Sequence, residues 1–261
     1  MLAGEETQTV LKVEHLTKVY PDGTKALDDI SFTVEDGTFL VIIGLSGSGK
    51  STLLRCINRL IEPTDGRVAW NDVDITALSQ SDLRKVRRHI GMIFQQFNLV
   101  KRSSVLTNAL SGRLGYVPSM PSLLGHWEPA DRERAMQALA TVGIADKAGN
   151  RADALSGGQQ QRVGIARALM QEPRLLLADE PVASLDPATS HSVMKYLEWL
   201  NRERGVTVLC SLHFLSLARA YGTRIIALKA GQRVFEGLPA EIDEARFKEI
   251  YGEEAVEVEI A

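Results

Sequence analysis

The sequence predicts a single α/β domain whose mostly parallel sheet is flanked by helices. Segments of strand length alternate with longer amphipathic segments over most of the chain, and Phe39–Ile43 is apolar at every position. A strand without a polar position is typical of the centre of a parallel sheet, where helices cover both faces. The length of 261 residues suits one sizeable domain, or one domain with a small appended lobe.

Bulk composition narrows the function classes. Hydrophobic residues make up 44% of the chain and charged residues 24%, which is typical of a globular protein with a substantial core. The formal net charge of −3 provides no basic field, so nucleic acid is not expected as a partner. The longest apolar runs are far shorter than the roughly 20 residues that cross a bilayer, so membrane association is expected only through a partner. Cys56 and Cys210 lie in separate apolar stretches and are expected to be buried thiols rather than a disulfide.

Hydrophobic periodicity places the individual elements. Val10–Leu16 alternates apolar and polar residues, as a half-exposed strand does. The helix expected over Pro187–Arg204 has apolar residues at the i, i+3, i+4 and i+7 spacing of a buried face, beginning at Val193. The other expected strands are Ile90–Phe94, Arg174–Ala178, Val206–Ser211, Arg224–Leu228 and Gln232–Glu236, and the other expected helices are Ser51–Leu60 and Ala130–Val142.

One region departs from the alternation of strands and helices. Residues 97–151 are helical and irregular in pattern, without a convincing strand, which predicts an inserted α-helical subdomain. The whole domain is expected to span residues 10–261. Residues 1–9 and the acidic segment 252–261 are expected to be flexible tails.

A glycine-rich loop follows the central apolar strand and precedes a helix. Its nine residues are Gly44, Leu45, Ser46, Gly47, Ser48, Gly49, Lys50, Ser51 and Thr52, which match the pattern G-x-x-x-x-G-K-[ST]. Glycines let backbone N–H groups converge on phosphate oxygens, and the helix N-terminus adds a favourable dipole. Lys50 is expected to neutralise β- and γ-phosphate charge, and the Ser51 hydroxyl to coordinate Mg²⁺. A flexible glycine turn is the alternative, but it would require neither the lysine nor the serine. The loop therefore predicts a P-loop NTPase core.

An apolar strand ends in two carboxylates at Asp179 and Glu180. In P-loop proteins an acid at this strand end holds Mg²⁺, often through water, and Asp179 suits that role. Glu180 is expected to polarise the attacking water. An acidic pair alone is usually just the end of a strand, but combined with the phosphate loop it indicates nucleotide hydrolysis.

The segment Leu-Ser-Gly-Gly-Gln-Gln-Gln-Arg at residues 155–162 resembles the signature motif of ABC ATPases. The other motifs of that family are present on both sides of the signature, in the order in which the family carries them. Each of these residues taken alone would be an ordinary loop or strand-end residue. Tyr20 resembles the aromatic residue that stacks on adenine, Gln95 the Q-loop glutamine, Ser184-Leu185-Asp186 the D-loop, and His213 the switch histidine. The resemblance extends from Val10 to about Gly237.

This resemblance implies a fold, a mechanism and a set of site residues. The implied fold adds antiparallel N-terminal strands to the P-loop core. Two copies of the chain are expected to pair head to tail, so that two ATP molecules lie between the phosphate loop of one copy and the signature of the other. The implied catalytic residues are Glu180, His213 and Gln95, the Mg²⁺ ligands are Ser51, Gln95 and Asp179, and the nucleotide contacts beyond the phosphate loop are Tyr20, Ser156, Gly157, Gly158, Gln159 and Asp186.

The sequence also departs from the family pattern at one point. Relatives usually carry an acidic residue soon after the switch histidine, whereas here His213 is followed by Phe214-Leu215-Ser216. The histidine itself is present, so hydrolysis is still expected. The missing acid leaves the details of the dimer contact open.

Several segments are similar to the ATP-binding subunits of phosphonate importers, which in turn resemble those of phosphite importers. They are residues 110–118, 123–125, 178–187 and 211–213. This similarity implies an ATP hydrolase coupled to transport, bound to the cytoplasmic face of the inner membrane through integral membrane permease subunits and served indirectly by a solute-binding protein. Phe97–Val100 is expected to be an exposed apolar segment that meets the permease.

Other readings of the same motifs stay open. The chain could be a soluble ABC-type assembly factor of a phosphonate-degrading complex, or the ATPase of another ABC importer. An exporter or cell-division ATPase is less well supported because of the segment from Leu110 to Gly125. A DNA-repair ATPase is the least supported, because no coiled-coil or zinc insertion interrupts the domain.

Overall fold

The computed structural model describes residues 8–118, 122, 125–183, 185–253 and 255. Its larger sheet has six strands in the order β10-β9-β3-β8-β7-β6. The five strands from β9 to β6 are parallel neighbours, and only β10 pairs antiparallel. The bounds of these strands are Phe39–Ile43 (β3), Ile90–Ile93 (β6), Leu175–Asp179 (β7), Thr207–Ser211 (β8), Arg224–Lys229 (β9) and Gln232–Gly237 (β10).

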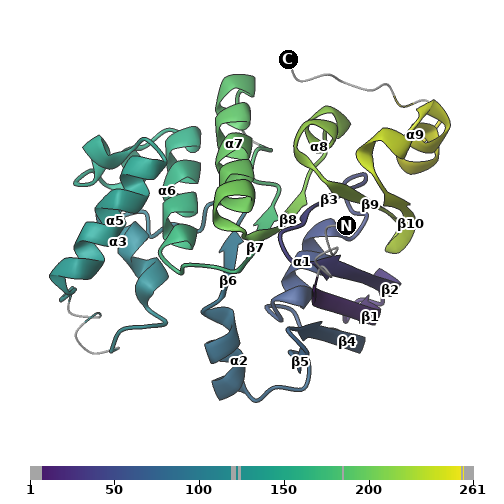
Figure 1. The fold of residues 1–261 in the computed structure, drawn as a ribbon, viewed down its shortest axis with the longest axis horizontal. Coiled ribbons are helices and arrows are strands. Elements are labelled where there is room, and N and C mark those ends of the chain that lie inside the picture. Colours follow the sequence, from purple (N-terminus) through teal and green to yellow (C-terminus); the bar gives the residue numbers. More distant parts are fainter. Residues whose placement is uncertain (1–7, 119–121, 123–124, 184, 254, 256–261) are drawn as a thin grey trace, which may run out of the picture.

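A second, antiparallel sheet lies beside the first and has the order β2-β1-β4-β5. Helix α1 (Lys50–Ile57) packs into the same apolar cluster as this sheet and the larger one (Figure 1). The strands are Thr9–Val19 (β1), Lys25–Glu35 (β2), Asp65–Trp70 (β4) and Val73–Asp74 (β5).

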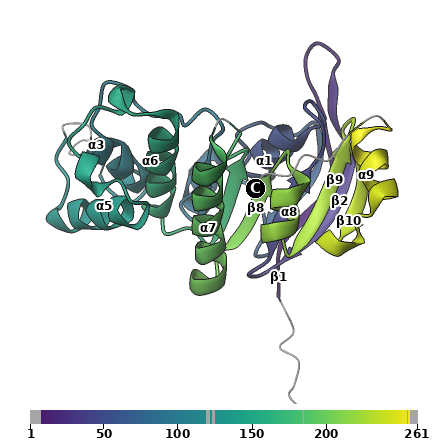
Figure 2. The ribbon, with the colours of Figure 1, turned by 90° about the horizontal axis from the view of Figure 1, so that it is seen from above.

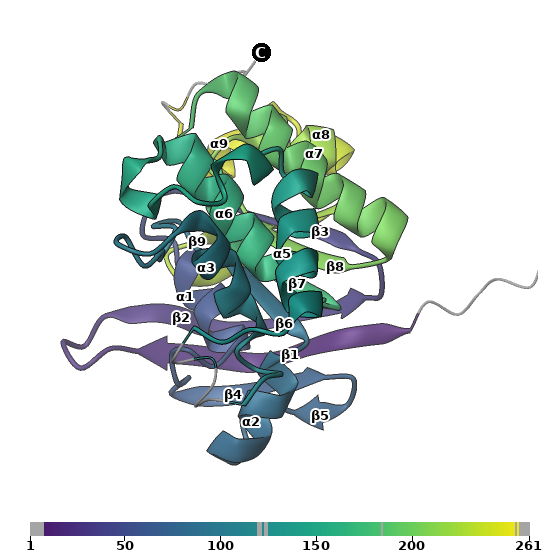
Figure 3. The same ribbon diagram turned by 90° about the vertical axis from the view of Figure 1, so that its left-hand side faces the viewer.

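The remaining helices form a helical lobe at one end and a layer over the larger sheet. In Figures 1 and 2 the lobe of α3, α5 and α6 lies on the left, and α7, α8 and α9 follow to the right. Figure 3 views the lobe end-on, with α2 below it beside β4 and β5. The helices are Gln80–Arg87 (α2), Val105–Leu110 (α3), Pro129–Thr141 (α5), Gly157–Leu169 (α6), Pro187–Arg204 (α7), Leu215–Tyr221 (α8) and Glu244–Tyr251 (α9).

The central strand β3 contributes to two apolar cores. Phe39, Val41 and Ile43 belong to the core shared with α6, α7 and α8, whereas Leu40 and Ile42 belong to the core around α1. All five side chains are buried, because alternate residues of a strand point to opposite faces and helices cover both. The expectation of a central, doubly covered strand is confirmed.

The bounds of the expected elements agree with the structure to within three residues. β3 and α7 have the predicted bounds. The helix predicted over Ser51–Leu60 ends at Ile57, because Asn58 leaves helical geometry and Arg59 has a φ of +51°. Residues 97–151 hold α3, α5 and short 3₁₀ turns. In the described part of this region the β structure is limited to an isolated bridge between Ser104 and Arg151, as the predicted helical insertion implies.

The helical lobe extends past the predicted insertion, since α6 packs against α3 and α5. β1 begins at Thr9, inside the segment expected to be a tail. Residues 1–7, 254 and 256–261 of the expected tails lie outside the described residues. Cys56 and Cys210 are buried free thiols, as expected. None of the helices in the described part of the chain is long and apolar enough to cross a membrane.

Candidate site of nucleotide hydrolysis

The phosphate loop is pressed against the strands on either side of it. Gly44, Gly47 and Gly49 have φ angles of +144°, +78° and +105°, which side chains rarely adopt. A Cβ on Gly44 would lie 2.2 Å from the carbonyl oxygen of Leu228, and one on Gly49 would lie 2.5 Å from that of Ala26. The loop therefore requires glycine at these two positions for space as well as for conformation.

The hydroxyl of Ser48 lies within this loop and is buried. It has no hydrogen-bond partner among the described residues. A buried hydroxyl without a partner is costly unless something satisfies it. A phosphate oxygen in the loop would accept its hydrogen, so the loop fits the phosphates of a nucleotide.

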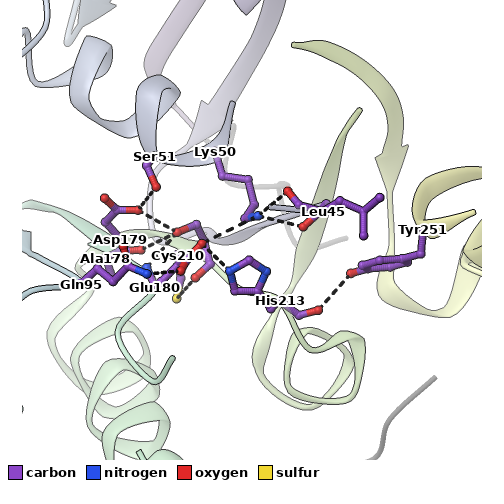
Figure 4. A network of polar contacts seen from close by, with 12 residues as sticks. Leu45, Lys50, Ser51, Gln95, Ala178, Asp179, Glu180, Cys210, His213 and Tyr251 are labelled. Atoms are coloured by element: carbon purple, nitrogen blue, oxygen red, sulfur yellow. Dashed lines mark hydrogen bonds and ion pairs between the residues drawn. The ribbon is translucent and has the colours of Figure 1, made fainter. Parts of the chain in front are cut away.

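Lys50 is the buried cation of the loop, with 3% of its side chain exposed. Its Nζ donates hydrogen bonds to the carbonyl oxygens of Gly44 at 2.8 Å and Leu45 at 3.0 Å. The same Nζ lies 3.8 Å from Oε1 of Glu180. Burial lowers the pKa of Lys50, while the charges of Glu180 and Asp179 oppose that shift. The lysine is thus held over the loop, next to the carboxylates that end β7 (Figure 4).

Asp179 is the fully buried last residue of β7. Ser51 Oγ donates to its Oδ1 at 2.7 Å, and Arg55 Nη2 donates to its Oδ2 at 3.1 Å. A hydroxyl and a carboxylate side by side are oxygen ligands that suit Mg²⁺, which proteins bind through one or two carboxylates together with substrate phosphates. The donor set at Ser51 and Asp179 therefore fits Mg²⁺.

Glu180 is the point where three segments of the chain meet. Gln95 Nε2 donates to its Oε2 at 2.6 Å, and His213 Nε2 lies 2.5 Å from its Oε1. The backbone N–H of Glu180 donates to Ser211 Oγ at 2.9 Å, and its φ is +47°. The hydrogen bond from His213 lowers the pKa of Glu180, burial works against this, and Lys50 and Gln95 add to it. The carboxylate is therefore ionised at neutral pH and able to accept a proton.

Tyr20 lies where β1 gives way to the turn before β2. Its hydroxyl is 3.3 Å from Thr52 Oγ1, so the ring stands beside the first turn of α1. Lys18 Nζ lies 5.4 Å from the centre of this ring. The aromatic residue expected against adenine is thus next to the phosphate loop.

A second tyrosine lies near the switch histidine: the hydroxyl of Tyr251 on α9 donates to the carbonyl oxygen of His213 at 3.4 Å.

The signature residues lie elsewhere on the molecule. Ser156 caps the N-terminus of α6, and Gln159 completes the capping box. Asp186 caps α7 by accepting a hydrogen bond from Thr189. A hollow joins these caps, and it is lined by Ser156, Gly157, Gly158, Gln159, Arg162, Leu185, Asp186 and Thr189.

This hollow and the phosphate loop are separate in one copy of the chain. In Figure 1, α6 lies to the left of β6 and α1 to its right. Across the described residues, no hydrogen bond or ion pair joins the signature to Lys50. The structure thus brings Gln95, Glu180 and His213 together with the loop, and leaves the signature and Asp186 apart. Ser184 of the expected D-loop lies outside the described residues.

Two residues of the site were not among those expected from the sequence, Arg55 and Ser211. Arg55 follows Ser51 by four residues, so both lie on one face of α1, and this spacing could have indicated a shared partner. Ser211 pairs with Asp179 across parallel strands β7 and β8. No sequence signal gives this pairing without the strand order.

The fold and the site define a P-loop ATPase cassette with a helical lobe that carries a separate signature hollow. The sequence model described as ABC transporter matches residues 27–183. A relative from Bdellovibrio bacteriovorus, named phosphonates import ATP-binding protein PhnC, is 56% identical over 97% of this chain and 97% of its own length. A protein of the same name from Staphylococcus haemolyticus is 54% identical over 93% of this chain and 94% of its own.

Solved structures give the same result. A dimeric ATP-binding cassette in a post-hydrolysis state with ADP and phosphate is 37% identical, with a TM-score of 0.80 over 88% of this chain and 98% of that one. A second dimeric structure, of a bacterial ABC transporter cassette, has the same identity, score and coverage. The chain therefore belongs to the ABC transporter family, and it is an ATP-binding and ATP-hydrolysing subunit of such a transporter.

Proposed function

We propose that this chain hydrolyses ATP to drive the import of phosphonates across the inner membrane, working at its cytoplasmic face. The observation that carries the substrate class is the name shared by relatives that match nearly the whole chain at 56% and 54% identity. The observation that supports the chemistry is the convergence of Lys50, Gln95 and His213 on the one carboxylate of Glu180.

The roles that we propose for the site residues combine the family resemblance with the contacts of each residue. Lys50 and the loop N–H groups bind the phosphates, and Tyr20 stacks on the base. Ser51, Asp179 and Gln95 would hold Mg²⁺, whose charge would neutralise phosphate charge during the transfer. Glu180 takes the proton of the attacking water. His213 and Gln95 keep that carboxylate ionised and oriented, because each contacts one of its oxygens.

The site is completed by a second copy of the chain. In this proposal Ser156, Gly157, Gly158 and Gln159 of one copy face the nucleotide on the phosphate loop of the other, and Asp186 lies at the same contact. The separation of the signature hollow from the phosphate loop within one copy supports this arrangement, as do the similar cassettes solved as dimers. A two-fold pairing makes both sites equivalent.

The permease contact is proposed at a hollow between β6 and the helical lobe. Arg87, Phe94, Gly112 and Arg167 are among its lining residues. Beside it, Val100 is 60% exposed and Phe97 is half-buried, so the segment after Gln95 presents apolar surface. Arg167 of α6 donates to the carbonyl oxygens of Phe97 and Asn98 at 2.8 and 2.6 Å.

These two hydrogen bonds connect the proposed permease contact to the site of ATP hydrolysis. A displacement of residues 97–100 by the permease would move Gln95 through the connecting backbone. It would also move α6 through the hydrogen bonds of Arg167. Because α6 begins at the signature, one contact can move both halves of the composite site.

The test uses the complex purified with its permease and reconstituted in lipid vesicles. A phosphonate-loaded solute-binding protein should raise ATP hydrolysis several-fold, whereas the same protein offered phosphate should not. Equal stimulation by phosphite would widen the substrate class. Recovery of the chain only in a soluble enzyme complex, with no integral membrane subunit, would contradict import and favour an assembly factor.

A further inference from the structure

The end of strand β8 holds a hydroxyl between the two acidic residues of the site. β7 and β8 are parallel, and their register places Ser211 opposite Asp179, each the last residue of its strand. Ser211 Oγ accepts the backbone N–H of Glu180 at 2.9 Å. The same oxygen lies 3.3 Å from Asp179 Oδ1, to which it can donate its hydrogen. One hydroxyl can fill both roles at once.

This hydroxyl lies where the backbone leaves the sheet. The φ of Glu180 is +47°, a left-handed conformation that is unfavourable for a residue with a Cβ. Such a conformation persists only where the surroundings hold it. The N–H of Glu180 points out of the strand ladder, and Ser211 is its acceptor.

Burial makes this support hard to replace. Ser211 is fully buried, so water cannot readily take the place of its hydroxyl. Without the hydroxyl, the N–H of Glu180 would be buried and unpaired, which is costly enough to drive a local rearrangement. Any relaxation of that φ would swing the carboxylate away from Gln95 and His213.

We propose that Ser211 is a positioning residue for ATP hydrolysis, which fixes the direction of the Glu180 carboxylate and the orientation of Asp179. The proposal rests on the role proposed above for Glu180. Because Ser211 acts through these two carboxylates, its loss should lower kcat and the use of Mg²⁺ in hydrolysis, and should leave the affinity for ATP unchanged.

The first experiment compares Ser211→Ala with Ser211→Thr, which retains the hydroxyl, and with Cys210→Ala, a matched truncation of the preceding buried residue. Ser211→Ala should lower kcat about tenfold, with KM for ATP changed less than about twofold. Ser211→Thr should keep kcat within about threefold of wild type. Cys210→Ala should retain the kcat of wild type even if its Tm falls as much as the Tm of Ser211→Ala. A loss of kcat that follows Tm equally in Ser211→Ala and Cys210→Ala would overturn the proposal.

The second experiment asks whether Ser211 acts through Glu180. In the Glu180→Gln background, Ser211→Ala should lower kcat by much less than tenfold, because its effect through Glu180 is already lost and only its effect on Asp179 remains. A further tenfold loss would overturn the proposal. Full hydrolysis by Glu180→Gln alone would instead contradict the role of Glu180, which separates the two failures. Binding of a fluorescent ATP analogue should be unchanged by Ser211→Ala, and its loss would also count against positioning.

Discussion

The carboxylate of Glu180 and the imidazole of His213 meet at 2.5 Å, although the two residues follow different strands of the sheet. β7 ends just before Glu180, and β8 ends two residues before His213. Because β7 and β8 are parallel neighbours, the segments that follow them leave the same edge of the sheet. Gln95 reaches the other oxygen of the carboxylate from the end of β6, the next strand along (Figure 4).

Glu180→Gln should separate ATP binding from hydrolysis. The amide keeps the shape of the side chain but cannot accept the proton of water, so kcat should fall at least about a hundredfold. ATP should still bind at the phosphate loop, and a dimer should accumulate that is visible by size exclusion with ATP. Glu203→Gln removes an exposed acid of α7 and should behave as wild type. Only monomers in the presence of ATP would contradict the proposed sandwich.

The contact between Glu180 and His213 should also appear in the pH dependence of stability. The pKa of Glu180 is lowered in the folded state, first by the hydrogen bond from His213. A carboxylate with a lowered pKa stabilises the fold at any pH above its unfolded value of about 4.3, and that contribution is lost as pH falls toward the folded value. The free energy of unfolding of wild type minus that of Glu180→Gln should therefore shrink as the pH falls below about 4.5.

Urea titrations at several pH values measure this difference. In the His213→Ala background the principal cause of the lowered pKa is absent, so most of the pH dependence should disappear. A difference that grows as the pH falls below about 4.5 would contradict the sign of the shift.

Local patterns in the sequence were enough to predict the strands of the larger sheet and the phosphate loop. The all-apolar segment at 39–43 is short and precedes a glycine-rich loop, which favours a doubly covered strand, and the G-x-x-x-x-G-K-[ST] pattern places Lys50 and Ser51 at a helix start. The convergence of Gln95, Glu180 and His213 came from family resemblance, because it depends on three strands being neighbours in the sheet.

Other features could not be read from local patterns. β2 alternates apolar and polar residues from Ile30 to Glu35, a strand signal that was missed among the expected elements, whereas β4 does not alternate. The pairing of both strands with β1 depends on contacts distant in sequence. The end of α1 depends on the positive φ of Arg59, whose guanidinium donates to the carbonyl oxygens of Ile75 and Leu78. A tertiary contact of this kind has no signature in the helix itself.

Gly44→Ala should damage the phosphate loop, whereas Gly149→Ala should not. A Cβ at position 44 would lie 2.2 Å from a backbone oxygen of β9, and the φ of +144° is strained for alanine. The loop would have to move, so ATP affinity should fall at least about tenfold and Tm should drop. Gly149 has open space around its Cβ position and no positive φ, which makes it the matched control. Unchanged ATP binding in Gly44→Ala would show that the loop is not held as described.

Both thiols should be unreactive in the folded protein. Burial raises the pKa of Cys56 to about 12, and it raises the pKa of the fully buried Cys210 as well. Since the thiolate is the reactive form, an aromatic disulfide reagent at pH 8 should label neither cysteine quickly, and should label both after denaturation. Fast labelling of one cysteine in the native protein would contradict this prediction and would show that the core opens around that cysteine.

The composite site predicts that two inactive variants restore activity when mixed. Lys50→Ala removes the cation of the phosphate loop. Ser156→Asp places a negative charge toward the partner's phosphates and still caps α6, since aspartate is as good an N-cap as serine. Each homodimer has two damaged sites. A mixed dimer has one site with both defects and one site with neither.

Random mixing of equal amounts should therefore recover about a quarter of wild-type ATPase activity, if two-fold pairing is free and the sites turn over independently. Ser156→Asn also caps the helix but adds no charge, so by itself it should lose less activity than Ser156→Asp. No recovery in the mixture, with both variants folded and dimers of both kinds present, would mean that the signature of one copy does not serve the phosphate loop of the other.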